Sequence, residues 1–454
     1  MKRKIIALIA LVVLTAQPVS AADGTKVAVT VYNNNLALVR EARTIRLKKG
    51  VQEYKYPDVA AQIDPTSVHF KSMTAPESIS ILEQNFEYDL VGTERLLEKY
   101  IGQDIITSTK DGNTYAGTLL SSRSGDVIIQ MQGGQVKVVK ANSLETIEFP
   151  ALPEGLITRP TLVWLLDAQQ GGKHESEVSY LTKGISWHAE YVAVANPKDT
   201  ELELSGWVSI DNKSGATFEN AKLKLVAGEV HLVKGRPTVR MESATVKKYF
   251  VGASAPFREK EFFEYHLYTL QRPATLKDRQ TKQLSLFPAT KVRVHKDYTY
   301  DGLQDKKKVR VNLEFKNDKE SGLGMPLPAG KIRVYKEDVD KSQEFIGEDW
   351  IDHTPKDEKV RVYLGNAFDI VGERNVIEEE KISKNSRRET VEIKLRNHKK
   401  DDITVTVIEH FWGDWQFVGK TPPIKKKTAR KVEFEVKVPA DAERVVQYTV
   451  LYRY

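Results

Sequence analysis

The densest group of side chains that could do chemistry lies between residues 348 and 358. Five carboxylates and one imidazole fall within these eleven residues: Glu348, Asp349, Asp352, His353, Asp357 and Glu358. Oxygen ligands at such short spacing suit Ca²⁺, and two carboxylates in unlike environments could carry out general acid–base catalysis. This block therefore suggests two specific hypotheses, a metal site and a hydrolytic site.

The spacing within the block argues against both hypotheses. A calcium loop uses an alternating Asp/Asn ladder with a central Gly, and that ladder is missing here. If residues 348–353 form a strand, successive carboxylates point to opposite faces and cannot converge on one ion. Thr354 to Asp357, with Pro355 in second place, predicts a type I turn. We expect an ordered polar corner in which Asp352 and His353 bond nearby backbone, and no metal ligands.

Aromatic residues give a second candidate, a surface on which sugars could stack. The chain has six Trp residues, and two of them, Trp412 and Trp415, lie in the aromatic run 411–417. On a strand, alternation places Trp412 on one face and Phe411 and Trp415 on the other. An exposed Trp would suit carbohydrate, whereas a Trp in a strand is more often part of the core, so both interpretations stay open.

Motifs for other common chemistries are missing. The sequence contains no phosphate-binding Gly loop followed by Lys and Ser/Thr, no H-E-x-x-H zinc helix and no Gly-x-Ser-x-Gly nucleophile turn. The nine His residues are scattered, and the lack of Cys excludes a thiol nucleophile, a Cys-bound metal and an iron–sulfur cluster. A Ser/His/Asp set can still assemble in space. We expect no catalytic residue, no cofactor and no metal, and a binding protein more than an enzyme.

The elements that must position these residues are strands, because apolar residues recur with a period of two. Turn residues separate the runs at intervals of roughly 8–12 residues, as in β-sandwiches and barrels. The best helical pattern runs from Thr93 to Tyr100, where Thr93 can cap the helix. The clearest alternating runs are 27–31, 44–47, 223–226, 309–313, 391–395 and 432–438.

A strand that runs into an Asn turn recurs three times, at Asn212, Asn317 and Asn397. Asn suits such a turn because its side chain bonds nearby backbone and tolerates positive φ. The three residues could be ligands of a binding site. A hairpin corner that is reused in related β-sandwich units explains them better.

Residues 94–149 combine a short helix with five short strands. That arrangement resembles the Sm-like barrel, and Gly117 lies where that family needs a bent strand. The acidic residue and the Asn that line the family's RNA pocket are missing, because Ser-Arg-Ser-Gly at 122–125 occupies that turn. The resemblance implies a small barrel, and we expect no nucleic-acid partner.

The N-terminus predicts export. Lys2, Arg3 and Lys4 precede an apolar run from Ile5 to Ala16, and small residues allow cleavage after Ala21. That run is too short to span a bilayer, no later run is long enough to do so, and no Cys offers a lipid attachment site. The 69 basic and 62 acidic residues are mixed along the chain, which is typical of a solvated surface. We expect a soluble periplasmic or secreted protein.

Several runs from Ser179 onward carry a further resemblance. They include residues 180–191, 207–215, 328–335, 347–358 and 365–370. In these runs the chain resembles a bacterial domain family of unknown function that is found in mucoidy-inhibitor-like proteins. The long coiled coil of some relatives is absent, and the small barrel stands in its place. The family offers no established catalytic residues, so the resemblance implies a fold but no mechanism.

These observations predict an all-β chain of several immunoglobulin-like β-sandwiches with a small five-stranded Sm-like barrel inserted near the N-terminus. We expect a signal peptide at 1–21, a β region at 22–92, the barrel at 93–150 and sandwiches at 151–285 and 286–454. A long basic loop at 234–260 could dock on an acidic envelope polymer, but a mobile surface insertion explains it better. We expect an envelope protein that binds a polymer or another protein. A hydrolase of envelope polymers is the alternative, and an Sm-like nucleic-acid binder comes third.

Overall fold

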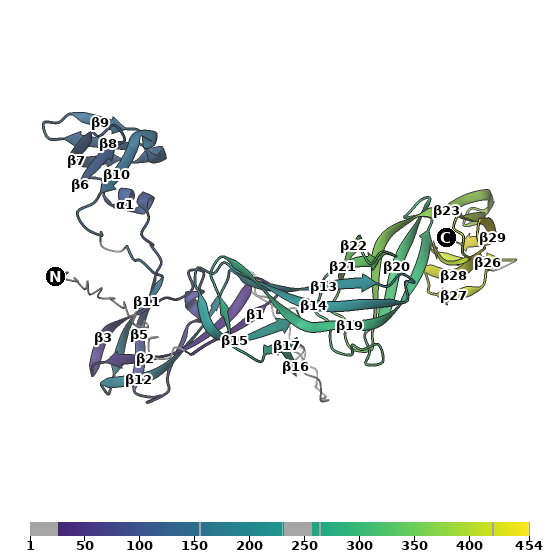
Figure 1. Cartoon of the computed structure of the whole chain (residues 1–454), viewed down its shortest axis with the longest axis horizontal. Helices are drawn as coiled ribbons and strands as arrows, with labels where there is room; N and C mark the ends of the chain where they lie inside the picture. Colours follow the sequence, from purple (N-terminus) through teal and green to yellow (C-terminus); the bar gives the residue numbers. More distant parts are fainter. Residues whose placement is uncertain are drawn as a thin grey trace, which may run out of the picture. The chain divides into compact units, whose positions relative to one another are not determined.

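The computed structural model describes residues 26–153, 156–228, 230, 257–262, 265–419 and 422–453 (Figure 1). Strands hold 66% of the described residues and helices 4%, which confirms the all-β class. The strands form several sheets, as multiple β-sandwiches require. The predicted signal peptide at 1–21 and residues 234–256 of the predicted basic loop lie outside the described residues.

The chain divides into two compact units. The first is built on Leu38–Leu181, and the second on Thr182–Thr217 and Lys222–Tyr454. Four strands contribute residues to both units: β1 (Lys26–Tyr32), β2 (Leu36–Leu47), β12 (Gly172–Thr182) and β15 (Phe218–Ala227).

In the first unit, an antiparallel sheet has Trp164 at its centre. The sheet consists of β3 (Gly50–Pro57), β11 (Thr161–Ala168) and β5 (Ile79–Glu87), with β11 in the middle. Trp164 is fully buried, and its Nε1 donates to Gln84 Oε1 at 2.9 Å, so the indole nitrogen is satisfied inside the core. Also in this unit, β12 (Gly172–Thr182) pairs with β4 (His69–Ser72), and η1 (Pro65–Ser67) precedes β4.

A short helix followed by a five-stranded antiparallel sheet occupies residues 93–148, with the strand order β10-β6-β7-β8-β9. The cap of the helix is Gly92 and makes no side-chain cap bond, so the predicted capping by Thr93 is wrong: Thr93 is the first helical residue. A Cβ on Gly117 would lie 2.3 Å from the Gln130 carbonyl oxygen, so close approach of the next strand requires glycine here. The elements are α1 (Thr93–Lys99), β6 (Asp104–Thr109), β7 (Thr114–Ser121), η2 (Arg123–Gly125), β8 (Val127–Met131), β9 (Val136–Val139), η3 (Ala141–Ser143) and β10 (Leu144–Glu148).

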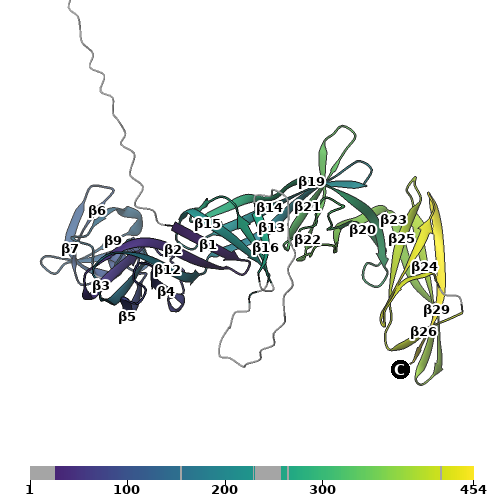
Figure 2. The same cartoon turned by 90° about the horizontal axis from the view of Figure 1, so that it is seen from below.

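The second unit contains a thirteen-stranded sheet, whose main path is β22-β21-β13-β14-β19-β20-β23-β24-β29-β26. Strand β25 pairs with β19 and β28, and β27 pairs with β28. Figure 2 shows β23, β24, β25 and β29 gathered together. The strands of this unit are β13 (Ile185–Ala195), β14 (Glu201–Asn212), β16 (Phe257–Phe262), β17 (Tyr265–Leu270), β18 (Ala274–Leu276), β19 (Gln280–Asp301), β20 (Lys308–Lys316), β21 (Gly330–Glu337), β22 (Gln343–Ile351), β23 (Lys359–Ser383), β24 (Ser386–Asn397), β25 (Ile403–His410), β26 (Asp414–Val418), β27 (Ile424–Lys427), β28 (Lys431–Val438) and β29 (Ala442–Arg453).

The three predicted Asn corners are structural corners. The side chains of Asn212, Asn317 and Asn397 are 1%, 0% and 1% exposed. Each Nδ2 donates to backbone carbonyls and each Oδ1 accepts a backbone N–H; for Asn317 the carbonyls are those of Met325, Thr354 and Pro355, and the N–H is that of Gly324. Because these buried amides are used by the backbone, the hairpin-corner interpretation is confirmed.

None of the described helices is long and apolar enough to cross a membrane.

Candidate functional site

One face of the second unit's sheet carries several buried polar residues, among them Thr299 and Asp301. Along β25, Val405 and Val407 face the apolar core, whereas Ile408 and His410 face the other side. On β19, Asp301 pairs with Ile408 and therefore lies on that second side, although it is only 4% exposed. Polar residues so deeply covered must find partners close by.

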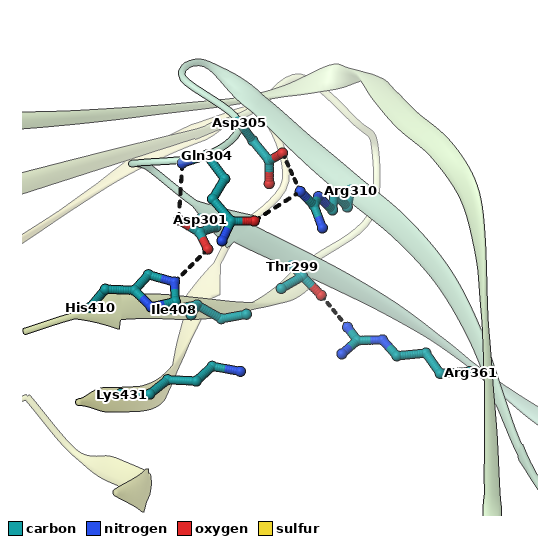
Figure 3. Close-up of a pocket in the computed structure, with 9 residues that line it drawn as sticks. All are labelled: Thr299, Asp301, Gln304, Asp305, Arg310, Arg361, Ile408, His410 and Lys431. Atoms are coloured by element: carbon teal, nitrogen blue, oxygen red, sulfur yellow. Dashed lines mark hydrogen bonds and ion pairs between the residues drawn. The ribbon is translucent and has the colours of Figure 1, made fainter. Parts of the chain in front are cut away.

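A pocket of about 220 Å³ lies on this polar face (Figure 3). The sheet register brings its walls together, because Thr299 pairs with Arg310, Asp301 with Ile408, and His410 with Lys431. Its volume is below the roughly 300–1,000 Å³ of sites for drug-sized ligands, so it suits one small chemical group. The lining residues come from β19, β20, β23, β25, β28 and the turn after β19: Thr299, Asp301, Gln304, Asp305, Arg310, Arg361, Ile408, His410 and Lys431.

Asp301 and His410 form a hydrogen-bonded pair in the pocket wall. The Nε2 of His410 lies 2.8 Å from Asp301 Oδ2. The other carboxylate oxygen accepts the backbone N–H groups of Leu303 and Gln304, each at 3.2 Å. These bonds hold the carboxylate in place, and the carboxylate in turn orients the imidazole ring.

Two arginines supply positive charge to the same pocket. Arg310 Nη2 donates to Asp305 Oδ1 at 2.6 Å, and this bond raises the pKa of Arg310. Arg361 Nη2 donates to Asp297 Oδ2 at 2.7 Å and also to the hydroxyl of Thr299. Each guanidinium carries five N–H donors, so these bonds occupy only part of its capacity.

The hydroxyl of Thr299 is fully used. It donates to Asp297 Oδ2 at 3.1 Å and accepts hydrogen bonds from Asn312 Nδ2, at 3.0 Å, and from Arg361. A hydroxyl has one donor and two acceptor positions, so all three are filled. Thr299 is therefore a fixed part of the wall and not an activated nucleophile.

Two cations point into the open part of the pocket from opposite sides. Figure 3 shows the ammonium of Lys431 and the guanidinium of Arg361 extending toward one another. Lys431 Nζ also lies 2.7 Å from Glu433 Oε1. Two like charges that face one another across a cavity favour a negative group between them.

A buried ion pair lies on the core side of β25, the strand that carries His410. Arg374 Nε donates to both carboxylate oxygens of Glu409, at 3.1 and 2.9 Å. Glu409 is 1% exposed, and burial raises its pKa, although Arg374 acts in the opposite direction. This pair holds β25 in place at Glu409, the residue next to His410.

The strand part of the predicted polar block is held by cations and backbone. Glu348 Oε1 lies 3.1 Å from Lys331 Nζ, and its Oε2 lies 3.4 Å from Arg333 Nε. Asp349 Oδ2 accepts the backbone N–H of Tyr363 at 2.7 Å. Both carboxylates are therefore engaged within the sheet.

The corner part of the block is bonded through backbone groups. His353 Nδ1 accepts the backbone N–H of Ala329 at 3.1 Å, and the carbonyl of Asp352 accepts the hydroxyl of Thr354 at 2.8 Å. Asp357 has φ 69°, and its N–H donates to the carbonyl of Asn317. The Glu358 carbonyl accepts the N–H of Asn317, so this segment closes the second Asn corner. None of the six residues of the block lines the pocket of Figure 3.

The two predicted aromatic candidates have different surroundings. Trp412 is 58% exposed. Trp415 stacks on Phe411 at 4.3 Å between ring centroids, and its Nε1 donates to the carbonyl of Ala429 at 2.7 Å. Trp415 thus packs on the core of the sheet, whereas Trp412 presents its ring to solvent.

The pocket residues are ones that the sequence did not single out. Asp301 and His410 are 109 positions apart, and no local motif joins them. The available signal was the alternation in β25, which places His410 opposite the core-facing valines. Within the part of the chain that the structure describes, no group of three or more His, Cys, Asp or Glu residues could hold a metal ion.

Comparison with known families finds one family model that matches most of this chain. The family described as Domain of unknown function (DUF4139) matches residues 176–454, which is more than half of the sequence. The chain belongs to this family. All nine pocket residues of this DUF4139 protein lie within the matched region, whereas α1 and the five-stranded sheet precede it. The resemblance to a domain family of unknown function is thereby confirmed. No curated protein matches the chain.

Proposed function

We propose that this DUF4139 protein is an exported envelope protein that acts by binding, and that the pocket of Figure 3 is its binding site. The charged residues 2–4, the apolar run 5–16 and the small residues up to Ala21 support export to the periplasm or beyond. The resemblance to mucoidy-inhibitor-like proteins fits that location. The partner is a polymer or a protein of the envelope.

The observation that carries the binding proposal is the convergence of hydrogen-bonding groups on one small pocket. Eight of its nine lining residues are polar or charged, and they come from five strands and one turn. A concave site with a few fixed polar groups is the usual form of a ligand site. The hydroxyl of Thr299, the one hydroxyl among the lining residues, is saturated. The pocket therefore supports binding more than nucleophilic catalysis.

Hydrolysis of an envelope polymer is the second candidate, and one observation favours it. A carboxylate that orients an imidazole, as Asp301 orients His410, is a frequent component of general-base catalysis. On this alternative His410 would activate a water molecule that attacks the polymer. The nucleophile would then come from solvent, because Thr299 has no free hydroxyl position.

The proposal extends to the domain layout. We assign a Sm-like barrel to residues 93–150 and β-sandwiches to 151–285 and 286–454. The helix that precedes a sheet of order β10-β6-β7-β8-β9 supports the barrel. The turn at 122–125 lacks the acidic residue and Asn of an RNA pocket, so nucleic-acid binding remains the third candidate.

Co-sedimentation of the mature chain with insoluble envelope material tests the proposed function. Lys431→Met removes a pocket cation, and Lys437→Met is the matched control, because Lys437 is an exposed residue of the same strand that does not line the pocket. We expect Lys431→Met to lose binding and Lys437→Met to keep it. Equal binding by both variants would overturn the assignment of the pocket. Release of soluble product by the wild type, abolished by His410→Asn, would establish the hydrolase instead.

A further inference from the structure

We propose that the pocket recognises a carboxylate-bearing sugar and holds its carboxylate between Lys431 and Arg361. This inference rests on the proposed function, because it names the ligand class of the same pocket. It is carried by three properties of the lining residues: their charge, the shape of the pocket and the balance of donors and acceptors.

The charge of the pocket suits a single negative charge. Lys431 and Arg361 face one another across the open space, and Arg310 adds a third cation. Each of the three also pairs with one carboxylate, Glu433, Asp297 and Asp305 respectively, and keeps further N–H donors for a ligand. Asp301 and Asp305 also line the pocket and would repel a second negative charge on the ligand. A monoanion therefore gains from the facing cations without meeting the full repulsion that a phosphate dianion would meet.

The shape of the pocket suits a terminal group. The side chains of Thr299, Asp301 and Ile408 line the pocket from the paired strands β19 and β25. A carboxylate lies at the end of its carrier and can enter such a small pocket end-on. A phosphodiester is also a monoanion, but chain continues from it on both sides, so it needs a groove that is open at two ends. The guanidinium of Arg361 is planar and matches the planar carboxylate.

The remaining lining groups suit the hydroxyls of a sugar. Sugar hydroxyls both donate and accept, so their site needs both kinds of partner. Asp305 and the Gln304 side-chain oxygen accept from Arg310 and keep further acceptor positions, and Arg310 and the Gln304 amide keep further donors. Ile408 is the one apolar residue among the nine, so the lining offers little to an apolar peptide side chain. A polar carrier, and a sugar in particular, fits this lining.

Isothermal titration calorimetry with the mature full-length chain tests the ligand class. The probes are d-glucuronate, d-glucose, acetate, dimethyl phosphate and glucose 6-phosphate. We expect d-glucuronate to bind at least about tenfold more tightly than each of the others, because d-glucose lacks the charged hydrogen-bond pair, acetate lacks the sugar hydroxyls, and the two phosphates lack the planar carboxylate. Lys431→Met should weaken d-glucuronate binding about tenfold, Lys431→Arg should restore it, and Lys437→Met should leave it unchanged.

Several results would overturn the inference. They are equal binding of d-glucose and d-glucuronate, tighter binding of dimethyl phosphate or glucose 6-phosphate, and equal effects of Lys431→Met and Lys437→Met. If no heat is detected, competition decides: excess d-glucuronate must displace the envelope material, and failure to do so overturns the sugar acid. If the envelope material is not displaced but its binding still depends on Lys431, the proposed function stands and only the sugar-acid inference fails. The failure of the inference and the failure of the proposed function are therefore distinguishable.

Discussion

Replacing Arg374 by Met should destabilise the second unit by an amount that depends on pH. Arg374 is the counter-charge of Glu409, whose two oxygens it contacts at 3.1 and 2.9 Å in the core. Met fills a volume similar to that of the apolar stem of Arg but carries no charge. Breaking a buried pair by removing one partner costs about 3–5 kcal/mol, because the other charge stays buried and uncompensated.

Protonation of Glu409 limits this free-energy cost and sets the direction in which the cost changes with pH. Burial raises the pKa of Glu409 above its ordinary 4.5, and loss of Arg374 raises it further. Protonating a carboxyl of pKa 4.5 at pH 7 costs about 3.4 kcal/mol, at about 1.36 kcal/mol per pH unit. A carboxyl whose pKa is raised by folding stabilises the native state below its unfolded pKa and loses this effect as pH rises. The deficit should therefore be at most about 3 kcal/mol at pH 7, and it should shrink as the pH falls toward 5 and grow as the pH rises.

Urea unfolding monitored by tryptophan fluorescence at about pH 5 and about pH 8 measures this deficit. The control is the double variant Arg374→Met with Glu409→Gln, which has no buried carboxylate and should show a deficit that is almost independent of pH. A deficit of the single variant that is equal at both pH values would refute the reasoning, since it would mean that Glu409 does not bear the uncompensated charge.

Three further results are expected. Asn397→Ala removes four hydrogen bonds to backbone groups from a buried side chain and should lower the free energy of unfolding by about 3 kcal/mol, whereas Asn385→Ala in an exposed turn should change it by less than about 0.5 kcal/mol; thermal unfolding compares the two. Gly117→Ala places a Cβ 2.3 Å from a carbonyl oxygen and should cost about 1–3 kcal/mol in the same assay; an unchanged melting temperature would show that the strands can move apart. N-terminal sequencing of the exported protein should begin at Ala22 or Asp23, and an intact Met1 would contradict export.

The features that the sequence predicted correctly are those that depend on short-range chemistry. Alternation of apolar residues identified the strands, because side chains point to opposite faces at every second position. The Asn corners were predictable because the amide bonds backbone within a few residues, as Asn397 bonds the Asp401 carbonyl. The capping of α1 was mispredicted because Gly92, one residue earlier, occupies the cap and leaves Thr93 inside the helix.

The pocket could not be predicted from the sequence, for a different reason. Its residues run from Thr299 to Lys431 and meet through the pairing of β19 with β20 and β25, of β20 with β23, and of β25 with β28. Pairing between strands that far apart in sequence depends on the whole sheet and leaves no local motif. The polar block at 348–358 attracted attention because its residues are neighbours in sequence, yet the structure spreads their bonds over β21, β23 and an Asn corner.

A crystal structure of the mature chain grown with d-glucuronate tests the central claim, that the pocket on the polar face is a ligand site, most directly. We expect the sugar in the pocket of Figure 3, with its carboxylate between the Lys431 ammonium and the Arg361 guanidinium. A sugar bound elsewhere on the chain, while this pocket holds only water, would contradict the claim.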